Sequence, residues 1–239
     1  MPEFSNRKNG QIRSPDGNAF WSFSTEMLIE LTFEEDDVTK AHWEGREWIC
    51  KRDERTLNEV IGYQIASTIG LPLQPWLAFE SPASRTIGAG MFIEWWDAGR
   101  IQACLVDLGT EYAALVARGL AFWVFGRDEW PEWLLSDDMK DLRFIDLDGT
   151  GPRLTVPPHE ALLRNYLGNT ESVLHTARHE AEARGITDAL HAEIYRLLAV
   201  DFSCVVDLSG YPGASTLSKI MLSGLQTRQR DLGVLLTTD

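Results

Sequence analysis

Lys51 and Glu59 are the first pair of residues whose types and positions suit chemistry. Lys51 ends a predicted strand, and Glu59 lies on the helix predicted next. A lysine held by a helix glutamate is how many phosphotransferases direct one cation at the phosphates of a nucleotide. The ordinary alternative is an exposed strand-end lysine near an exposed helix acid, and this pair alone does not separate the two interpretations.

Two aspartates further along the chain complete a possible reaction centre. Asp128 directly follows an apolar helix, where a carboxylate can orient or deprotonate a hydroxyl nucleophile, although turn and cap aspartates occupy the same kind of position. Asp146 leaves the apolar strand at residues 144–145 and is followed by Asp148, so both are candidate oxygen ligands for Mg²⁺. The alternative for this segment is ordinary Asp-Gly turn chemistry. A strand Lys, a helix Glu, a loop Asp and a strand-end Asp follow the order that a kinase-like fold requires.

The acidity of the chain is concentrated around these aspartates. The 22 Lys and Arg residues against 36 Asp and Glu residues give a net charge of −14. Between Asp128 and Asp148, eight acids face only Lys140 and Arg143, so this segment carries −6 of the total. Such a cluster forms either a solvated face or, beside apolar strands, a site for a divalent metal. The overall charge argues against non-specific nucleic-acid binding, which needs a positive surface.

The length and composition predict a globular protein of the cytoplasm. A chain of 239 residues is long enough for one large domain or two small lobes with a substantial core. The N-terminus has no apolar stretch typical of a secretory signal, and no apolar run approaches the ~20 residues of a membrane helix. Three cysteines are too few for a dense disulfide framework, so we expect free thiols in a reducing compartment. We therefore expect no membrane association.

The elements predicted before residue 99 form a compact α+β unit. A capping-box spacing between Thr56 and Glu59 predicts the start of a helix, and Gly70 followed by Pro72 predicts its end. Residues 34–37 are predicted to form a turn, and residues 1–19 a flexible N-terminal arm. The predicted strands are Glu26–Phe33, Trp43–Lys51, Trp76–Glu80 and Met91–Trp96.

The chain after residue 99 is predicted to be mainly helical. Trp133–Leu135 and Leu142–Ile145 predict a hairpin that ends at Asp146. The predicted helices are Thr110–Phe125, Glu160–Leu167, Glu171–Arg184, Thr187–Phe202 and Ser215–Leu232. We therefore expect an arm at 1–19, a small β-rich N-terminal lobe at 20–99 and a mainly helical C-terminal lobe at 100–239.

Several segments resemble the HipA-like kinases, which have a two-lobed kinase-related fold. The segment Asn58–Leu73 is similar to the Asn-Glu…Leu-Ala…Gly-Leu-Pro-Val-Pro segment of that family. Trp123–Asp128 lies where the family has an apolar helix end followed by Asn-x-Asp-Arg. Leu134–Leu135 and Phe144–Asp146 resemble its Asn-Leu-Leu…Val-Ile-Asp run, and Ser218–Leu236 resembles its closing helix. The resemblance loosely covers residues 25–236.

This resemblance implies an ATP- and Mg²⁺-dependent phosphotransferase of the protein Ser/Thr kinase type. Lys51 would contact the nucleotide phosphates, and Glu59 would hold Lys51. Asp128 would be the catalytic aspartate, and Asp146 would bind Mg²⁺ with assistance from Asp148. The strand Met91–Trp96 would lie beside adenine, with Glu94 as a contact. The expected partners are a nucleotide and a protein substrate or regulatory partner.

The chain also departs from the family, which keeps other interpretations open. Glu129 replaces the basic residue after the catalytic aspartate, and Glu132 is the one oxygen ligand that can replace the missing metal-binding Asn. No glycine-rich phosphate loop precedes Lys51, since Gly45 stands alone. The alternatives are a catalytically impaired pseudokinase, a protein-interaction module, or an acidic metal-binding protein without nucleotide.

Overall fold

The N-terminal part of the chain forms an antiparallel sheet of seven strands. The computed structural model describes residues 10–13, 20–23, 29–35, 38–43, 46–51, 55–74, 76–80, 89–94, 101–102, 110–126, 132–135, 142–154, 160–206 and 214–237. The sheet order is β2-β1-β6-β7-β5-β4-β3, and every neighbouring pair is antiparallel. Its strands are β1 (Gly10–Arg13), β2 (Phe20–Phe23), β3 (Ile29–Glu35), β4 (Val38–Trp43), β5 (Arg46–Lys51), β6 (Trp76–Glu80) and β7 (Ala89–Glu94).

The sheet corrects three of the sequence predictions. The irregular arm predicted for residues 1–19 is wrong at Gly10–Arg13, because β1 pairs with β2 and with β6. The turn predicted for residues 34–37 is wrong in its first half, because β3 continues through Glu35. The single strand predicted for Trp43–Lys51 is β5 alone, and Trp43 ends the separate strand β4. Short strands with polar residues on one face give a weak periodic signal in the sequence. Whether such a segment forms a strand therefore depends on the strands with which it pairs.

Helix α1 (Thr56–Thr68) connects β5 to β6 and ends as predicted. Gly70 has a φ of +73°, its N–H donates to the carbonyl of Ser67, and the N–H of Leu71 donates to the carbonyl of Ala66. This pair of hydrogen bonds is a Schellman motif, which requires a left-handed residue that glycine adopts without strain. The predicted capping box is wrong, because Arg55 is the N-cap and no side chain caps this helix.

A second, three-stranded sheet is formed by strands from the middle of the chain. It has the order β10-β9-β8, with β8 at Ile101–Gln102, β9 at Glu132–Leu135 and β10 at Leu142–Ile145. The predicted β9–β10 hairpin is confirmed, and β8 was not predicted. On its other side β10 meets the segment after α1, where the N–H of Phe144 donates to the carbonyl of Pro72 at 2.8 Å. The short 3₁₀ helix η5 (Leu147–Gly149) follows β10.

Helices make up most of the remaining chain. The described helices are η4 (Thr110–Tyr112), α2 (Ala113–Phe125), α3 (Glu160–Gly168), α4 (Thr170–Ala183), α5 (Thr187–Leu198), α6 (Phe202–Val205) and α7 (Ala214–Thr237). The single helix predicted for Thr187–Phe202 is two helices. The carboxylate of Asp201 accepts a hydrogen bond from the N–H of Ser203 and so caps a new helix.

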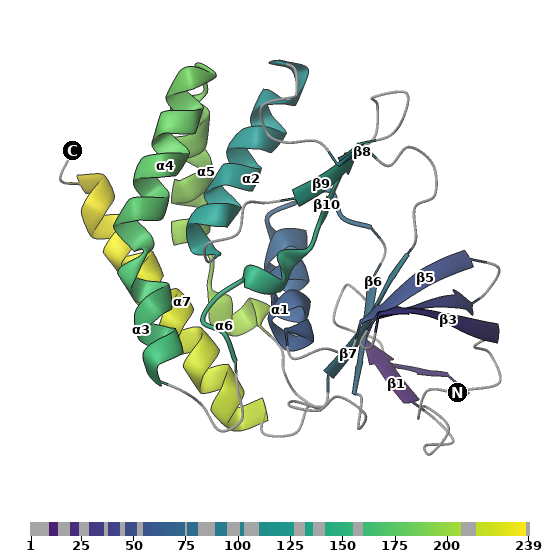
Figure 1. The fold of residues 1–239 in the computed structure, drawn as a ribbon. Coiled ribbons are helices and arrows are strands. Elements are labelled where there is room, and N and C mark those ends of the chain that lie inside the picture. The colour runs from purple at the N-terminus through teal and green to yellow at the C-terminus, as the bar shows by residue number, and fades with distance from the viewer. Residues whose placement is uncertain are drawn as a thin grey trace.

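One hydrophobic core joins these parts into an α+β architecture. Figure 1 shows α1 between the seven-stranded sheet and the helices α2–α7. The buried core cluster includes Leu57, Val60 and Ile61 of α1 together with residues of α2, α4, α5 and α7. This core is therefore continuous across the boundary predicted near residue 99. None of the described helices combines the length and apolar character needed to span a membrane.

Candidate functional site

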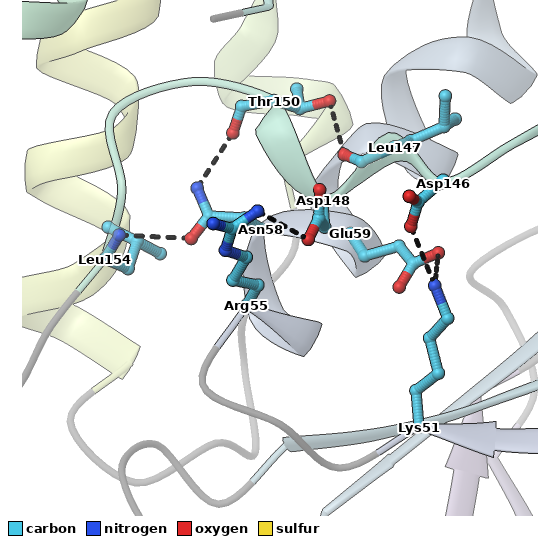
Figure 2. A network of polar contacts seen from close by, with 9 residues as sticks. All are labelled: Lys51, Arg55, Asn58, Glu59, Asp146, Leu147, Asp148, Thr150 and Leu154. Atoms are coloured by element: carbon cyan, nitrogen blue, oxygen red, sulfur yellow. Dashed lines mark hydrogen bonds and ion pairs between the residues drawn. The ribbon is translucent and has the colours of Figure 1, made fainter. Parts of the chain in front are cut away.

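Lys51, Glu59 and Asp146 converge where β5, α1 and the end of β10 meet. The ammonium of Lys51 donates to the Oε1 atom of Glu59 and to the Oδ1 atom of Asp146, each at 3.0 Å (Figure 2). Lys51 and Asp146 are 95 residues apart in the chain, so only the tertiary fold brings them together. This places a single cation between two carboxylates.

The elements around Lys51 explain this convergence. Lys51 is the last residue of β5, an interior strand of the seven-stranded sheet, so its backbone is held by β4 and β7. Glu59 lies in the first turn of α1, and the N-cap of this helix, Arg55, is four residues beyond the end of β5 at Lys51. Helix α1 contacts β7, the neighbour of β5 in the sheet, and its first turn brings Glu59 to Lys51 at the end of β5.

Strand β10 positions Asp146, which reaches Lys51 from a different part of the fold than Glu59 does. Phe144 is fully buried, and its ring meets the Trp133 ring edge-on at a centroid distance of 5.0 Å. A Cβ atom at Gly119 of α2 would lie 2.7 Å from the Phe144 ring, so the absence of a side chain there lets α2 pack closely on β10. The strand that ends just before Asp146 is thus fixed by α2 and by β9.

Asp146 has an unusual backbone conformation at the point where β10 ends. Its φ of 56° and ψ of 55° make it the one left-handed residue other than glycine in the described part of the chain. Asp tolerates this conformation better than most residues, but it still carries a cost that the surroundings must offset. The conformation turns the chain from β10 into η5 and leaves the Asp146 side chain 45% exposed beside Lys51.

Burial and charge act in opposite directions on the Lys51–Glu59 pair. Glu59 is only 1% exposed, and this burial raises its pKa from 4.5 to about 7 although the Lys51 ammonium acts to lower it. Burial also acts to lower the pKa of Lys51, but the carboxylates of Glu59 and Asp146 outweigh it and raise that pKa well above its usual range. Lys51 therefore stays charged at neutral pH.

A second ion pair lies next to this cluster. The guanidinium of Arg55 donates to the Oδ2 atom of Asp148 at 3.3 Å (Figure 2). Asp148 is 14% exposed and belongs to η5, two residues after Asp146. The predicted metal ligand Asp148 thus lies on the same loop as Asp146, and it contacts Arg55 at the start of α1.

Tyr63 packs one turn after Glu59 and was not recognised from the sequence. It is fully buried, its ring meets Trp76 edge-on at 5.6 Å, and its hydroxyl has no hydrogen-bond partner among the described residues. Burial raises the pKa of this hydroxyl well above its ordinary value, and the Glu59 carboxylate adds to the effect. Tyr63 is therefore a neutral, apolar support beside the charged cluster.

Three of the predicted site residues are not placed by the structure. Asp128 lies outside the described residues. Glu132 begins β9 and Glu94 ends β7, in register with Trp48 of β5, but their side chains are also outside the described part. Among the described residues, no group of three His, Cys, Asp or Glu side chains is arranged to hold a metal ion. The metal ligands predicted at Asp146 and Asp148 remain predictions.

Arg55 and Asn58 complete the polar network and had no assigned role in the sequence analysis. Asn58 stands next to Glu59 in the segment that resembles the HipA-like kinases, and that adjacency was its one signal.

A scan against protein-family models and a search of curated proteins each found no match to this chain. A function for this chain therefore has to be inferred from the geometry of Lys51, Glu59 and Asp146.

Proposed function

We propose that this chain binds ATP with Mg²⁺ and is a phosphotransferase with a two-lobed, kinase-like fold. The observation that supports the proposal is the double contact of Lys51 with Glu59 and Asp146, each at 3.0 Å. An ammonium held by a buried glutamate beside an exposed aspartate suits a nucleotide, since the ammonium can pair with phosphate oxygens and the aspartate can bind Mg²⁺. The resemblance of residues 58–73 to the HipA-like kinases points the same way.

Each residue has a separate role in this proposal. Lys51 pairs with the nucleotide phosphates, while Glu59 holds Lys51 in place from the buried side. Asp146 binds Mg²⁺, and Asp148 supports the metal from η5. Asp128 orients or deprotonates the hydroxyl acceptor of a protein substrate. Glu94 at the end of β7 lies beside adenine, and Glu132 is an additional oxygen ligand for the metal.

The second candidate is a pseudokinase that binds nucleotide or a protein partner without transferring phosphate. It is favoured by Glu129 and Glu132, which add negative charge where the HipA-like kinases have a basic residue and a neutral one. Added negative charge next to the reacting aspartate repels the triphosphate. The two candidates share the Lys51–Asp146 site and differ in the transfer step alone.

Thermal unfolding with and without ligand tests the binding part of the proposal. At a Mg-ATP concentration of about 100 Kd the wild type gains ~2.7 kcal/mol, which is roughly 5–10 °C in Tm for a chain of this size. Asp146→Asn is expected to lose the Mg²⁺-dependent part of this shift, whereas Lys51→Met loses the metal-free ATP shift as well. Asp231→Asn is the matched control, since Asp231 is 44% exposed and also pairs with a cation, Arg230.

Two results would contradict the proposed roles. A Mg-ATP shift that is unchanged in Asp146→Asn excludes Asp146 as the metal ligand. A wild type that shows no shift with ATP or GTP, with or without Mg²⁺, excludes nucleotide binding. Incubation with radiolabelled ATP then separates the candidates, because transfer or hydrolysis that is lost in Asp128→Asn identifies an active phosphotransferase and excludes the pseudokinase.

A further inference from the structure

Asn58 makes a hydrogen-bonded clamp between α1 and the chain that follows Asp146. Its side chain is 1% exposed, and its Nδ2 atom donates to the carbonyls of Thr150 at 2.8 Å and Pro152 at 3.0 Å. Its Oδ1 atom accepts from the N–H of Leu154 at 3.1 Å (Figure 2). One buried amide thus satisfies three backbone groups that lie 92 to 96 residues further along the chain.

The segment 150–154 depends on Asn58 because none of the described strands pairs with it. Thr150 has an extended backbone, Gly151 has a φ of +73°, and the segment belongs to neither sheet. Thr150 and Leu154 are each 2% exposed, so water has little access to their backbone groups. Buried carbonyls and N–H groups without partners are costly, and the Asn58 amide replaces the ladder that a neighbouring strand would provide.

The face of α1 that carries Asn58 contacts the loop that carries Asp146 (residues 146–154) at several points. Arg55, Asn58, Glu59 and Gly62 are spaced i, i+3, i+4 and i+7, which places them on one side of a helix. Arg55 pairs with Asp148, Glu59 pairs with the lysine that Asp146 also contacts, and Gly62 allows the backbone of Leu147 to approach α1 closely. Asn58 lies between these contacts and makes three hydrogen bonds to the loop.

We propose that Asn58 is a positioning residue that holds the loop of Asp146 against α1 and so keeps Asp146 within reach of Lys51. This inference rests on the proposed function in assigning a purpose to the Lys51–Asp146 contact, but the contact itself is a geometric property of the chain. Asn58 acts at a distance, because its own hydrogen bonds go to residues 150, 152 and 154 and none goes to Lys51 or Asp146. It fixes the register of the loop relative to Glu59, its neighbour on α1.

A chemical probe of Lys51 tests the clamp without requiring any activity. The full-length wild type, Asn58→Ala and the milder Asn58→Ser are treated with an amine-acylating ester, and acylation of Lys51 is measured by mass spectrometry relative to the exposed Lys219. Loss of the charge-assisted Asp146 contact is expected to raise the relative acylation of Lys51 about tenfold in Asn58→Ala, with a smaller rise in Asn58→Ser.

Gln229 supplies a matched control for the loss of an amide clamp. Its Nε2 atom lies 2.7 to 3.0 Å from the carbonyl oxygens of Leu197, Leu198 and Val200, to which its two N–H groups donate, at the end of α5. Gln229→Ala therefore removes the same kind of interaction from a place without contact to Lys51. We expect its relative Lys51 acylation to stay within about twofold of the wild type, because sites far apart act independently.

The two readouts separate failure of the inference from failure of the proposed function. If the wild type responds to Mg-ATP, Asn58→Ala is expected to weaken the Mg²⁺-dependent part of ATP affinity about tenfold while metal-free ATP affinity changes less than about threefold. If the wild type does not bind ATP, the proposed function fails and acylation still tests the clamp. Unchanged Lys51 acylation in both Asn58 variants, or an equal rise in Gln229→Ala, overturns the inference. Should neither Asn58 variant fold, hydrogen exchange in the wild type decides it, since an unprotected Leu154 amide contradicts the clamp.

Discussion

The substitution Gly62→Ala probes how closely α1 packs against the Asp146 loop. A Cβ atom at Gly62 would lie 2.6 Å from the carbonyl oxygen of Leu147, 2.6 Å from the Thr150 hydroxyl and 2.7 Å from the Leu147 Cβ. Ordinary contact begins at 3.4 Å, so α1 and the loop would have to separate by about 0.8 Å, the difference between the two distances. The Leu147 carbonyl oxygen and Cβ atom are held in place by the backbone of the loop. A rotamer change therefore cannot relieve their contact with the added Cβ atom.

The size of the effect follows from two opposing terms. Overpacking a buried position costs about 1–3 kcal/mol, and this site is at the upper end because backbone must move. Alanine gains about 1 kcal/mol over glycine in the interior of a helix. We therefore expect Gly62→Ala to lower the free energy of unfolding by about 2 kcal/mol, which is a large part of the stability of a typical domain.

Urea denaturation of Gly62→Ala and of Gly233→Ala measures this directly. Gly233 lies within α7, and a Cβ atom there would meet no heavy atom within 4 Å. Gly233→Ala thus keeps the gain in helix propensity without the clash, and it should raise the free energy of unfolding by about 0.5–1 kcal/mol. Close packing at Gly62 is contradicted if Gly62→Ala is as stable as the wild type, or if both variants are destabilised to the same degree.

Two further predictions concern buried polar groups. Because burial raises the pKa of Glu59 to about 7, its contribution to stability is fully present below 4.5 and is lost as the pH rises to about 7. Urea denaturation between pH 4.5 and 8 should show the wild type losing stability relative to Glu59→Gln over this range, and a relative gain would contradict the shifted pKa. Tyr166 of α3 is fully buried, and its hydroxyl donates at 2.8 Å to the carbonyl of Phe125, the last residue of α2. Tyr166→Phe should cost about 1–2 kcal/mol in thermal unfolding, while Tyr195→Phe at an exposed position should stay within about 0.5 kcal/mol, and equal effects would argue against the Phe125 contact.

Local sequence patterns were sufficient for elements with a strong period or a distinctive end. The apolar helix that ends at Phe125, the Gly70 stop after α1 and the hairpin before Asp146 were all predicted correctly. In each case the signal lies within a few residues, because helix caps and hairpins are closed by hydrogen bonds between near neighbours in the chain.

The same local rules were wrong where a distant partner competes for a residue. Glu59 has the spacing of a capping box with Thr56, yet its side chain contacts Lys51, since a buried ammonium binds a carboxylate more strongly than a backbone N–H does. Strand β1 has little apolar character and forms through its pairing with β2 and β6. Its existence therefore depends on partners that no short window of sequence contains.

From the sequence alone it was possible to identify which residue types could do chemistry, the order in which they occur, and that Lys51 and Asp146 stand at the ends of strands with Glu59 on the helix between them. Tertiary structure decided that these three meet, with Lys51 within 3.0 Å of both carboxylates. It also decided that Asn58, which has no chemical signature of its own, ties α1 to the loop of Asp146. The physical reason is that a buried polar group must find its partners wherever the folded chain places them, and here they lie more than 90 residues away.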